Sequence, residues 1–218
     1  MIIGDLKCNR MINPVGFNYG KPRLSWIVSE VPGDAKINAR VLVSTSEDFS
    51  NICYDSGVLD NYDSACFEAG FDPEPMTRYY WKVILNDSES KTAFFETSKS
   101  DLPWKANWIS PDFGDNSIHP LLRKEFTVSR DKMIISAKAY LCGLGLYEME
   151  INGQKVGDEY FTPFCNAYDK WIQYQTFDIT NLVSRGKNCV GTILGNGWYK
   201  GRFSFALNKT EIYGKDFA

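Results

Sequence analysis

Short segments in which apolar and polar residues alternate recur along the first hundred positions, and amphipathic helical stretches are nearly absent. Residues 39–44 read Ala-Arg-Val-Leu-Val-Ser, a pattern that suits a half-buried β-strand. Turn-forming residues at 31–34 and 86–88 separate such segments. The strands expected in this half cover residues 23–28, 39–44, 52–57, 79–85 and 93–97.

This spacing of strands predicts an all-β domain over residues 1–100. About seven short strands in about 80 residues is typical of an immunoglobulin-like or fibronectin-III-like β-sandwich. The strand at 79–85 contains Trp81 and is expected to supply the central aromatic side chain of the core. The polar, proline-containing segment 98–103 follows the last strand of this domain, and we place the domain boundary there.

The second half, residues 101–218, again predicts β-strands. They are expected at 121–126, 137–142, 146–151, 173–178 and 188–194. Asn152-Gly153 directly after a strand is a strong signal for a hairpin turn. Residues 180–183 are expected to form one helical turn that ends before Gly186. The pattern predicts a jelly-roll, a galactose-binding-like sandwich, and only five or six of its eight strands are expected before the sequence stops.

Composition narrows the function classes. The 218 residues are 44% apolar and 15% aromatic, which suits β-sandwich cores and also sugar-binding surfaces. The net charge is −3 and the basic residues form no run or stripe, so nucleic acid is not an expected partner. No apolar run approaches the roughly 20 residues that a membrane span needs, so no membrane association is expected.

Six cysteines, at 8, 53, 66, 142, 165 and 189, form no CxxC pattern. A chain of this size does not need a disulfide framework, and Cys142 and Cys189 are expected to be buried thiols because they lie within apolar runs. The N-terminus lacks the basic start and apolar core of a secretory signal. Together these features favour a cytoplasmic location.

The sequence offers no recognisable catalytic group. His119 is the only histidine and stands before Pro120 in a polar loop, which argues against a catalytic triad and a zinc site. Glycoside hydrolysis needs two carboxyl groups on opposite sides of a scissile bond. Glu148 and Glu150 are two residues apart on one predicted strand and point the same way, about 7 Å apart. We therefore expect no catalytic residue in this chain.

A non-catalytic sugar site is a better candidate. Residues 196–202 follow an apolar strand and combine Trp198 and Tyr199 with the hydrogen-bonding side chains of Asn196 and Arg202. Such sites join an aromatic platform to polar groups that reach hydroxyls. Asp158 is a further candidate on the same rim. The alternative is a structural corner in which the tryptophan covers the core, and the sequence leaves both readings open.

The connection after the Asn-Gly turn carries further oxygen-bearing side chains. Asp158-Glu159 and the segment 166–169, which includes Asn166 and Tyr168, could contribute to sugar binding or hold calcium, which takes six to eight oxygen ligands. No compact Asp-rich loop is present, so polar turn chemistry is the competing interpretation. No cofactor is expected apart from this calcium ion, which stays open.

From Asn13 onwards the chain resembles the N-terminal region of bacterial α-L-rhamnosidases of glycoside hydrolase family 78. The resemblance rests on motifs in this order: Asn13–Gly16, Pro22–Trp26, Tyr79–Val83, Ala139–Glu148, Ile151–Asp158 and Leu194–Arg202. The first three motifs are similar to that family's immunoglobulin-like domain, and the last three are similar to its β-sandwich module.

The resemblance implies non-catalytic accessory modules of an inverting, exo-acting hydrolase, whose acid and base lie in a helical (α/α)6 barrel further along the parent chain. It also implies that the rest of the parent enzyme is a partner. The second module is similar to carbohydrate-binding domains, some of which hold L-rhamnose with calcium, so a rhamnose-containing glycoside is a candidate ligand. Two alternatives stay open: a free-standing binding or adhesion protein, and a complete small enzyme.

Overall fold

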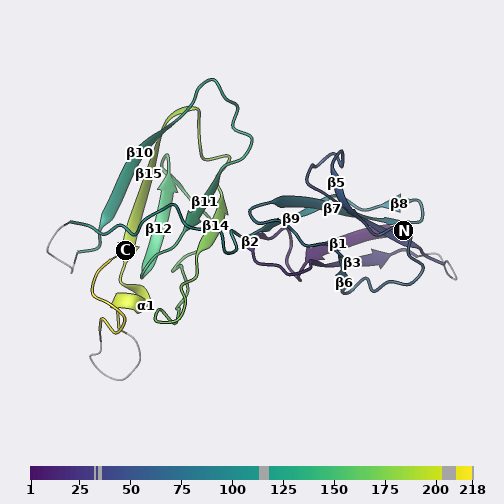
Figure 1. The fold of residues 1–218 in the computed structure, drawn as a ribbon, viewed down its shortest axis with the longest axis horizontal. Helices are drawn as coiled ribbons and strands as arrows, with labels where there is room; N and C mark the ends of the chain where they lie inside the picture. Colours follow the sequence, from purple (N-terminus) through teal and green to yellow (C-terminus); the bar gives the residue numbers. More distant parts are fainter. Residues whose placement is uncertain (32, 34–35, 113–117, 203–209, 218) are drawn as a thin grey trace. The chain divides into compact units, whose positions relative to one another are not determined.

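The computed structural model describes residues 1–31, 33, 36–112, 118–202 and 210–217. The chain divides into two compact units, Met1–Pro103 and Trp104–Ala218. The regular secondary structure of each unit is almost entirely β-strand, so the predicted all-β fold class is confirmed (Figure 1). Within the described residues, no helix is both long and apolar enough to cross a membrane.

The first unit is a sandwich of two sheets that lie face to face (Figure 1). One sheet has the order β2 (Val15–Phe17), β9 (Ala93–Thr97), β7 (Arg78–Leu85), β4 (Ala39–Ser44) and β5 (Ile52–Asp55), with β8 (Ser88–Glu89) paired to β7. The other has the order β1 (Ile2–Cys8), β3 (Arg23–Ser29) and β6 (Phe67–Glu68). All pairings are antiparallel except that of β2 with β9, in which Val15 lies opposite Glu96.

The core of the first unit follows from the alternation along β7. Tyr79, Trp81 and Val83 are buried on the inner face, and the residues between them are only partly covered. This confirms the prediction that Trp81 is a core aromatic. Phe95 on β9 is fully buried, with its ring centroid 5.2 Å from that of Tyr79 and 5.5 Å from that of Tyr19. The alternation of buried and partly covered side chains along β7 is that of a β-strand, and it determines which face of the strand is buried.

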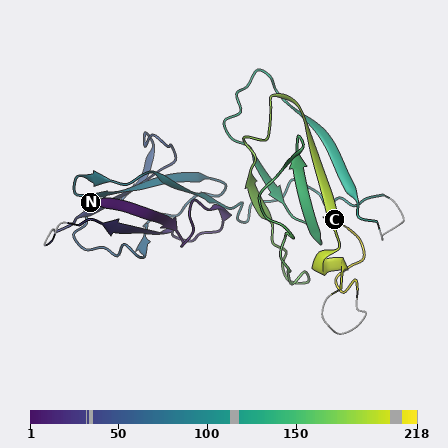
Figure 2. The ribbon, with the colours of Figure 1, turned by 180° about the vertical axis from the view of Figure 1, so that it is seen from behind.

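The second unit contains a four-stranded and a two-stranded sheet. The larger sheet has the order β10 (Leu121–Val128), β15 (Gly186–Gly195), β12 (Leu146–Ile151) and β13 (Gln154–Lys155). The smaller sheet pairs β11 (Lys138–Leu141) with β14 (Gln175–Asp178). A four-residue helix, α1 (Gly197–Lys200), directly follows β15, and Figure 2 shows it from behind.

The predicted hairpin at Asn152-Gly153 is confirmed. Both residues have positive φ angles, 54° and 77°, as a tight two-residue turn requires, and Glu150 pairs with Lys155 across it. The Asn152 amide also bonds to β15, because its Nδ2 donates to Asn188 Oδ1 at 2.9 Å and its Oδ1 accepts from the Cys189 amide at 2.9 Å. The turn is thereby fixed to the central strand.

Some details differ from the sequence-based expectation. The seven-residue strand β1 and the short strands β2, β6, β8 and β13 were not predicted. The expectation that Cys142 and Cys189 are buried is wrong, since both are half-buried. Cys189 lies on the outward face of β15 opposite Glu125, and Cys142 follows the edge strand β11. All six thiols are free.

Candidate functional site

The candidate sugar-site residues 196–202 follow β15 and begin with a sharp corner. Gly197 has a φ angle of +51°, and a Cβ atom there would lie 2.9 Å from the carbonyl carbon of Gly145. Gly145 has a φ angle of +118°, and its Cβ would lie 2.3 Å from the carbonyl oxygen of Gly195. Side chains are strained or excluded at both positions. Two glycine backbones in direct contact therefore fix where Asn196 and α1 sit.

The corner brings together three tyrosines from distant parts of the chain. The ring of Tyr168 meets that of Tyr199 edge-on, with 5.1 Å between centroids and 70° between planes. The ring of Tyr213 also packs against that of Tyr168, with 5.2 Å between centroids. All three rings are half-buried. Aromatic contacts of this kind add to the gain from burial. We call Tyr168, Tyr199 and Tyr213 the tyrosine cluster.

Two polar atoms at this corner are buried and lack a hydrogen-bond partner among the described residues. They are the hydroxyl of Tyr168 and the Oδ1 atom of Asn196. Burial raises the pKa of the Tyr168 hydroxyl, an effect that the nearby Asn166 amide partly offsets. Buried polar groups are nearly always paired, so each of these two atoms is a candidate for a ligand contact. A hydroxyl can donate and accept and an amide oxygen can accept, which are the contacts that sugar hydroxyls make.

Asn166 makes hydrogen bonds within its own loop, and its proposed contact with a sugar stays a prediction. Its side chain is buried, and its Nδ2 donates to the Phe164 carbonyl at 2.9 Å. Its Oδ1 accepts from the Gln173 amide at 3.1 Å. Both ends of the amide thus hold the 164–173 loop, which in turn carries Tyr168. Asn166 supports the site from within the loop.

The other candidate residues are distributed around the corner. Trp198 is half-buried, so its ring is neither a fully exposed platform nor a core residue. Arg202 is exposed where the described range ends. Asp158 is exposed on the loop after β13, and no contact is recorded that joins its side chain to residues 196–202 in the described part of the chain. Proximity of Asp158 to the corner therefore stays a prediction.

Sequence reasoning missed two residues of this region. Tyr213 completes the tyrosine cluster, and Lys200 is buried with its Nζ atom 3.8 Å from the centre of the Phe217 ring. An ammonium over an aromatic face is an attractive contact, particularly when it is shielded from water. Tyr213 stands in no recognisable motif, and Lys200 lies within the 194–202 motif, but its contact with Phe217 depends on tertiary packing that the motif does not reveal.

The groups considered for catalysis make contacts within the second unit. Glu148 and Glu150 lie on the same outward face of β12, as predicted, and Glu148 pairs with Lys155 at 3.4 Å. His119 Nδ1 lies 3.1 Å from the Leu194 carbonyl oxygen, a contact that joins the start of β10 to β15. In the described ranges, no three His, Cys, Asp or Glu side chains gather closely enough to hold a metal ion.

Two protein-family models match the chain, one for each unit. Residues 3–101 match the Rha78A-like N-terminal immunoglobulin domain, and residues 132–218 match the α-L-rhamnosidase N-terminal domain. The chain belongs to the α-L-rhamnosidase family, as its N-terminal region. The predicted resemblance and the predicted order of an immunoglobulin-like domain before a second β-domain are thereby confirmed.

Comparisons with individual rhamnosidases agree with the matches to the family models. An α-L-rhamnosidase of Formosa agariphila is 29% identical over 226 residues, covering 88% of this chain and 24% of the relative. The solved α-L-rhamnosidase of Dictyoglumus thermophilum is 32% identical with a TM-score of 0.75, covering 91% of this chain and 25% of that one. An α-L-rhamnosidase of Streptomyces avermitilis solved with L-rhamnose shares the fold at a TM-score of 0.81 with 18% identity. The chain spans about a quarter of the length of the curated relatives that align along most of it.

Proposed function

We propose that the two units are non-catalytic accessory domains of an α-L-rhamnosidase, which hydrolyses terminal α-L-rhamnosides through a catalytic domain elsewhere in the parent polypeptide. The observation that carries this proposal is that both units match rhamnosidase N-terminal domains in order, while they account for only about a quarter of the relatives' length. The carboxylates of β12 support it, because they share one face and cannot flank a glycosidic bond.

An activity comparison tests this role. The 218-residue chain and the longer parent polypeptide are assayed side by side on an aryl α-L-rhamnoside. The expected result is hydrolysis by the longer protein and none by the 218-residue chain. Turnover that scales with the concentration of the short chain and is lost in Glu148→Gln would establish a complete small enzyme instead. An inactive parent that still binds sugars would favour the adhesion-protein alternative.

We further propose that the corner after β15 binds a sugar weakly, with Trp198 or Tyr199 as the stacking surface. Asn196, Arg202 and Asp158 would reach the hydroxyls in this site. The supporting observation is that Tyr168 OH and Asn196 Oδ1 are buried with no hydrogen-bond partner in the described part of the chain, and that Tyr168 belongs to the tyrosine cluster. An open surface offers a monosaccharide few contacts, so the dissociation constant is expected near 1 mM, about −4 kcal/mol.

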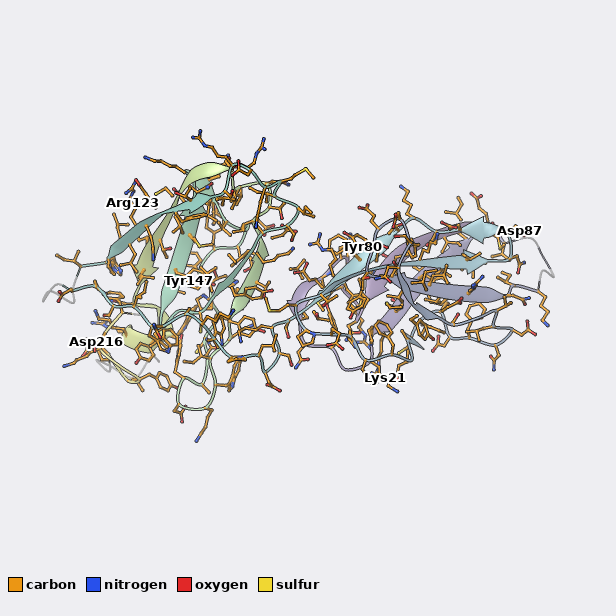
Figure 3. All side chains as sticks on the ribbon, turned by 45° about the horizontal axis from the view of Figure 1, so that its top comes forward. Lys21, Tyr80, Asp87, Arg123, Tyr147 and Asp216 are labelled. Atoms are coloured by element: carbon orange, nitrogen blue, oxygen red, sulfur yellow. The ribbon has the colours of Figure 1, made fainter. Side chains whose placement is uncertain are left out.

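Titration of L-rhamnose into isotopically labelled chain, followed by NMR with and without calcium, tests this site. The expected result is a set of saturable shifts confined to residues around 166–168 and 196–202, which Trp198→Ala abolishes. Tyr80→Phe is the matched control, because Tyr80 lies on β7 of the first unit (Figure 3). Absence of shifts at about 50 mM sugar, fifty times the expected dissociation constant, leaves only the accessory structural role.

A further inference from the structure

The outward face of the larger sheet in the second unit is exposed and partly apolar. β15 lies between β10 and β12 in that sheet (Figure 1). Leu194 on β15 is buried in the core, so Ile193 and the other odd-numbered residues of the strand point outward. The register places Leu121 on one side of Ile193 and Glu148 on the other. Leu121 and Ile193 are both exposed, so this face presents apolar side chains to solvent.

Two adjoining cavities form a groove along this face. One has a volume of about 490 Å³ and includes Gly191 in its lining. The other has a volume of about 360 Å³ and includes Gly195. Glu148 and Ile193 line both cavities, which are therefore continuous. We call the two together the β15 groove. None of the described residues in 196–202 lines it, so it is separate from the corner after β15.

Gly191 lies on the floor of the β15 groove, and the fold around it does not require a glycine. Its φ angle is outside the left-handed region, and a Cβ atom at this position would have nothing within 4 Å among the described residues. A glycine inside a strand weakens the strand, and it often marks a place where a ligand or another backbone approaches closely. The open space above Gly191 therefore points to an occupant from outside the described chain.

Opposite charges border the space above Gly191. Arg123, labelled in Figure 3, lies next to Gly191 on β10, and Glu150 lies next to it on β12. The Cα atoms of Arg123 and Glu150 are two strand spacings apart, about 10 Å. Arg123 pairs with Glu125 at 2.7 Å, whereas the Glu150 side chain has no ion pair or hydrogen bond within the described ranges. A guanidinium can only donate hydrogen bonds and a carboxylate can only accept them, so an occupant must offer both kinds of partner.

Exposed aromatic rings border the other end of the groove. Tyr160 and Phe161 both line it and are exposed. The loop that carries them runs along β12, because the Tyr147 amide donates to the Thr162 carbonyl at 2.9 Å. The Lys155 ammonium lies 3.2 Å from the centre of the Tyr160 ring, an attractive contact that holds this ring in place. Aromatic rings with an exposed surface can pack against the flat C–H faces of sugars.

We propose that the β15 groove binds a neutral oligosaccharide, at a site separate from the corner after β15. The ring hydroxyls of this ligand donate to the carboxylates of Glu148 and Glu150 and accept from Arg123, and each hydroxyl can act in both ways. The C–H faces of the ligand pack on Phe161 and Ile193. The proposal does not depend on a catalytic domain in the parent protein or on sugar binding at the corner.

The shape and charge of the groove favour this class of ligand over others. Gly191 and Gly195 are four residues apart on β15, about 13 Å, which is longer than one monosaccharide ring. A peptide strand would bind at the edge of a sheet, where backbone groups are available for pairing, and not on its face. The carboxylates at 148 and 150 repel an anionic chain. A neutral chain of several rings therefore fits the lining best.

Titration of a neutral trisaccharide into isotopically labelled 218-residue chain, followed by NMR, tests the proposal. The probe ends in α-L-rhamnose, a choice that follows from the proposed function, and maltotriose is the second neutral probe. The expected result is a set of saturable shifts within 121–123, 148–150, 160–161 and 189–193. A trisaccharide of uronic acids should bind there at least about tenfold more weakly, because its charges meet the two carboxylates.

Gly191→Val tests the groove without removing a contact of the fold. The two methyl groups of valine occupy the open space above β15, so the affinity for the trisaccharide should fall at least about tenfold. Valine favours strands, so the thermal midpoint of the second unit should be kept or raised. Gly4→Val is the matched control, because Gly4 lies on β1 of the first unit and likewise has open space around its Cβ. Glu150→Gln keeps the size of the side chain and removes its charge, so it should weaken binding about fivefold.

Absence of shifts on this face at about 10 mM of both neutral trisaccharides would overturn the proposal, since weak sugar sites have dissociation constants near about 1 mM. Equal affinity in the wild type and in Gly191→Val would also overturn it, as would equal binding of the uronic acid trisaccharide. A dimer in which a second copy covers the same residues would contradict it as well, because that copy would then be the occupant.

The proposed function and this inference fail in different ways. Shifts in the groove that persist in Trp198→Ala, with none at 196–202 in the wild type, would contradict the corner site and leave the groove site intact. A parent protein that hydrolyses rhamnosides while no trisaccharide binds in the groove would contradict only the groove site. Binding of maltotriose alone would support the groove site and contradict the choice of a rhamnose-ended ligand.

Discussion

Replacing Tyr168 by phenylalanine is expected to stabilise the second unit. The change removes a buried hydroxyl that has no hydrogen-bond partner among the described residues and leaves the ring contacts with Tyr199 and Tyr213 in place. An unsatisfied buried polar group costs about 1–3 kcal/mol, and its removal should recover an amount of that order. If the hydroxyl is kept for a ligand, the same change should weaken rhamnose binding.

Tyr147→Phe is the matched control. It is the same chemical change in the same unit, but the Tyr147 hydroxyl donates to Gln175 Oε1 at 2.5 Å. Its loss removes a hydrogen bond and leaves an acceptor with one partner fewer, so destabilisation by about 1 kcal/mol is expected. The two substitutions should therefore shift stability in opposite directions.

Urea unfolding followed by hydrogen exchange of β14 and β15 measures both effects in the second unit alone. With a typical dependence of about 1–3 kcal/mol per molar urea, a change of 1–3 kcal/mol moves the midpoint by roughly 1 M. A midpoint that falls in Tyr168→Phe as it does in Tyr147→Phe would refute the reasoning, because it would mean that the Tyr168 hydroxyl is already satisfied in the free protein.

Three further outcomes are expected. Phe95→Ala removes a fully buried ring stacked on Tyr79 and should destabilise the first unit by about 3–5 kcal/mol in calorimetry, leaving the second transition unchanged. Gly145→Ala should cost more than about 1 kcal/mol, whereas Gly191→Ala, with open space around its Cβ, should be nearly neutral in the same melt. The hydrogen bond from Arg40 lowers the pKa of Asp55 in the folded state. The pair therefore stabilises the folded state fully above the pKa of an aspartate in the unfolded chain, about 3.9. This contribution is lost as the pH falls through the lower pKa that Asp55 has in the folded state. Asp55→Asn should flatten that part of an acid-unfolding profile, and an unchanged profile would contradict the assignment.

The sequence predicts the strands and turns that are determined by residues adjacent in the chain. β12 was predicted with its observed bounds and β7 to within one residue, since alternation over six to eight residues is enough to define a strand. The Asn152-Gly153 turn was predicted because two adjacent positive φ angles favour that pair. By contrast, β6, β8 and β13 have two residues each, too few for any periodicity.

The candidate site was predicted only in part for the same reason. The residue types at 196–202 indicate a polar and aromatic corner, but the contact of Tyr168 with Tyr199 joins positions 31 apart and depends on tertiary packing. Asn166 is a candidate ligand by its residue type, and in the structure its amide bonds within its own loop, so its contact with a sugar stays a prediction. Local hydrogen bonding competes with ligand binding for the same atoms, and the residue type alone does not decide between them.

The parallel pairing of β2 with β9 has a consequence for the timing of biosynthesis. Val15 lies opposite Glu96, so these two strands cannot pair until residue 97 has left the ribosome. At a synthesis rate of about 5–20 residues per second, about 4–16 seconds pass between the synthesis of β2 and that of β9. During this time β2 is not paired with β9. Synonymous codons that slow or speed translation between residues 17 and 97 should change how long β2 stays unpaired with β9, and with it the yield of folded first domain.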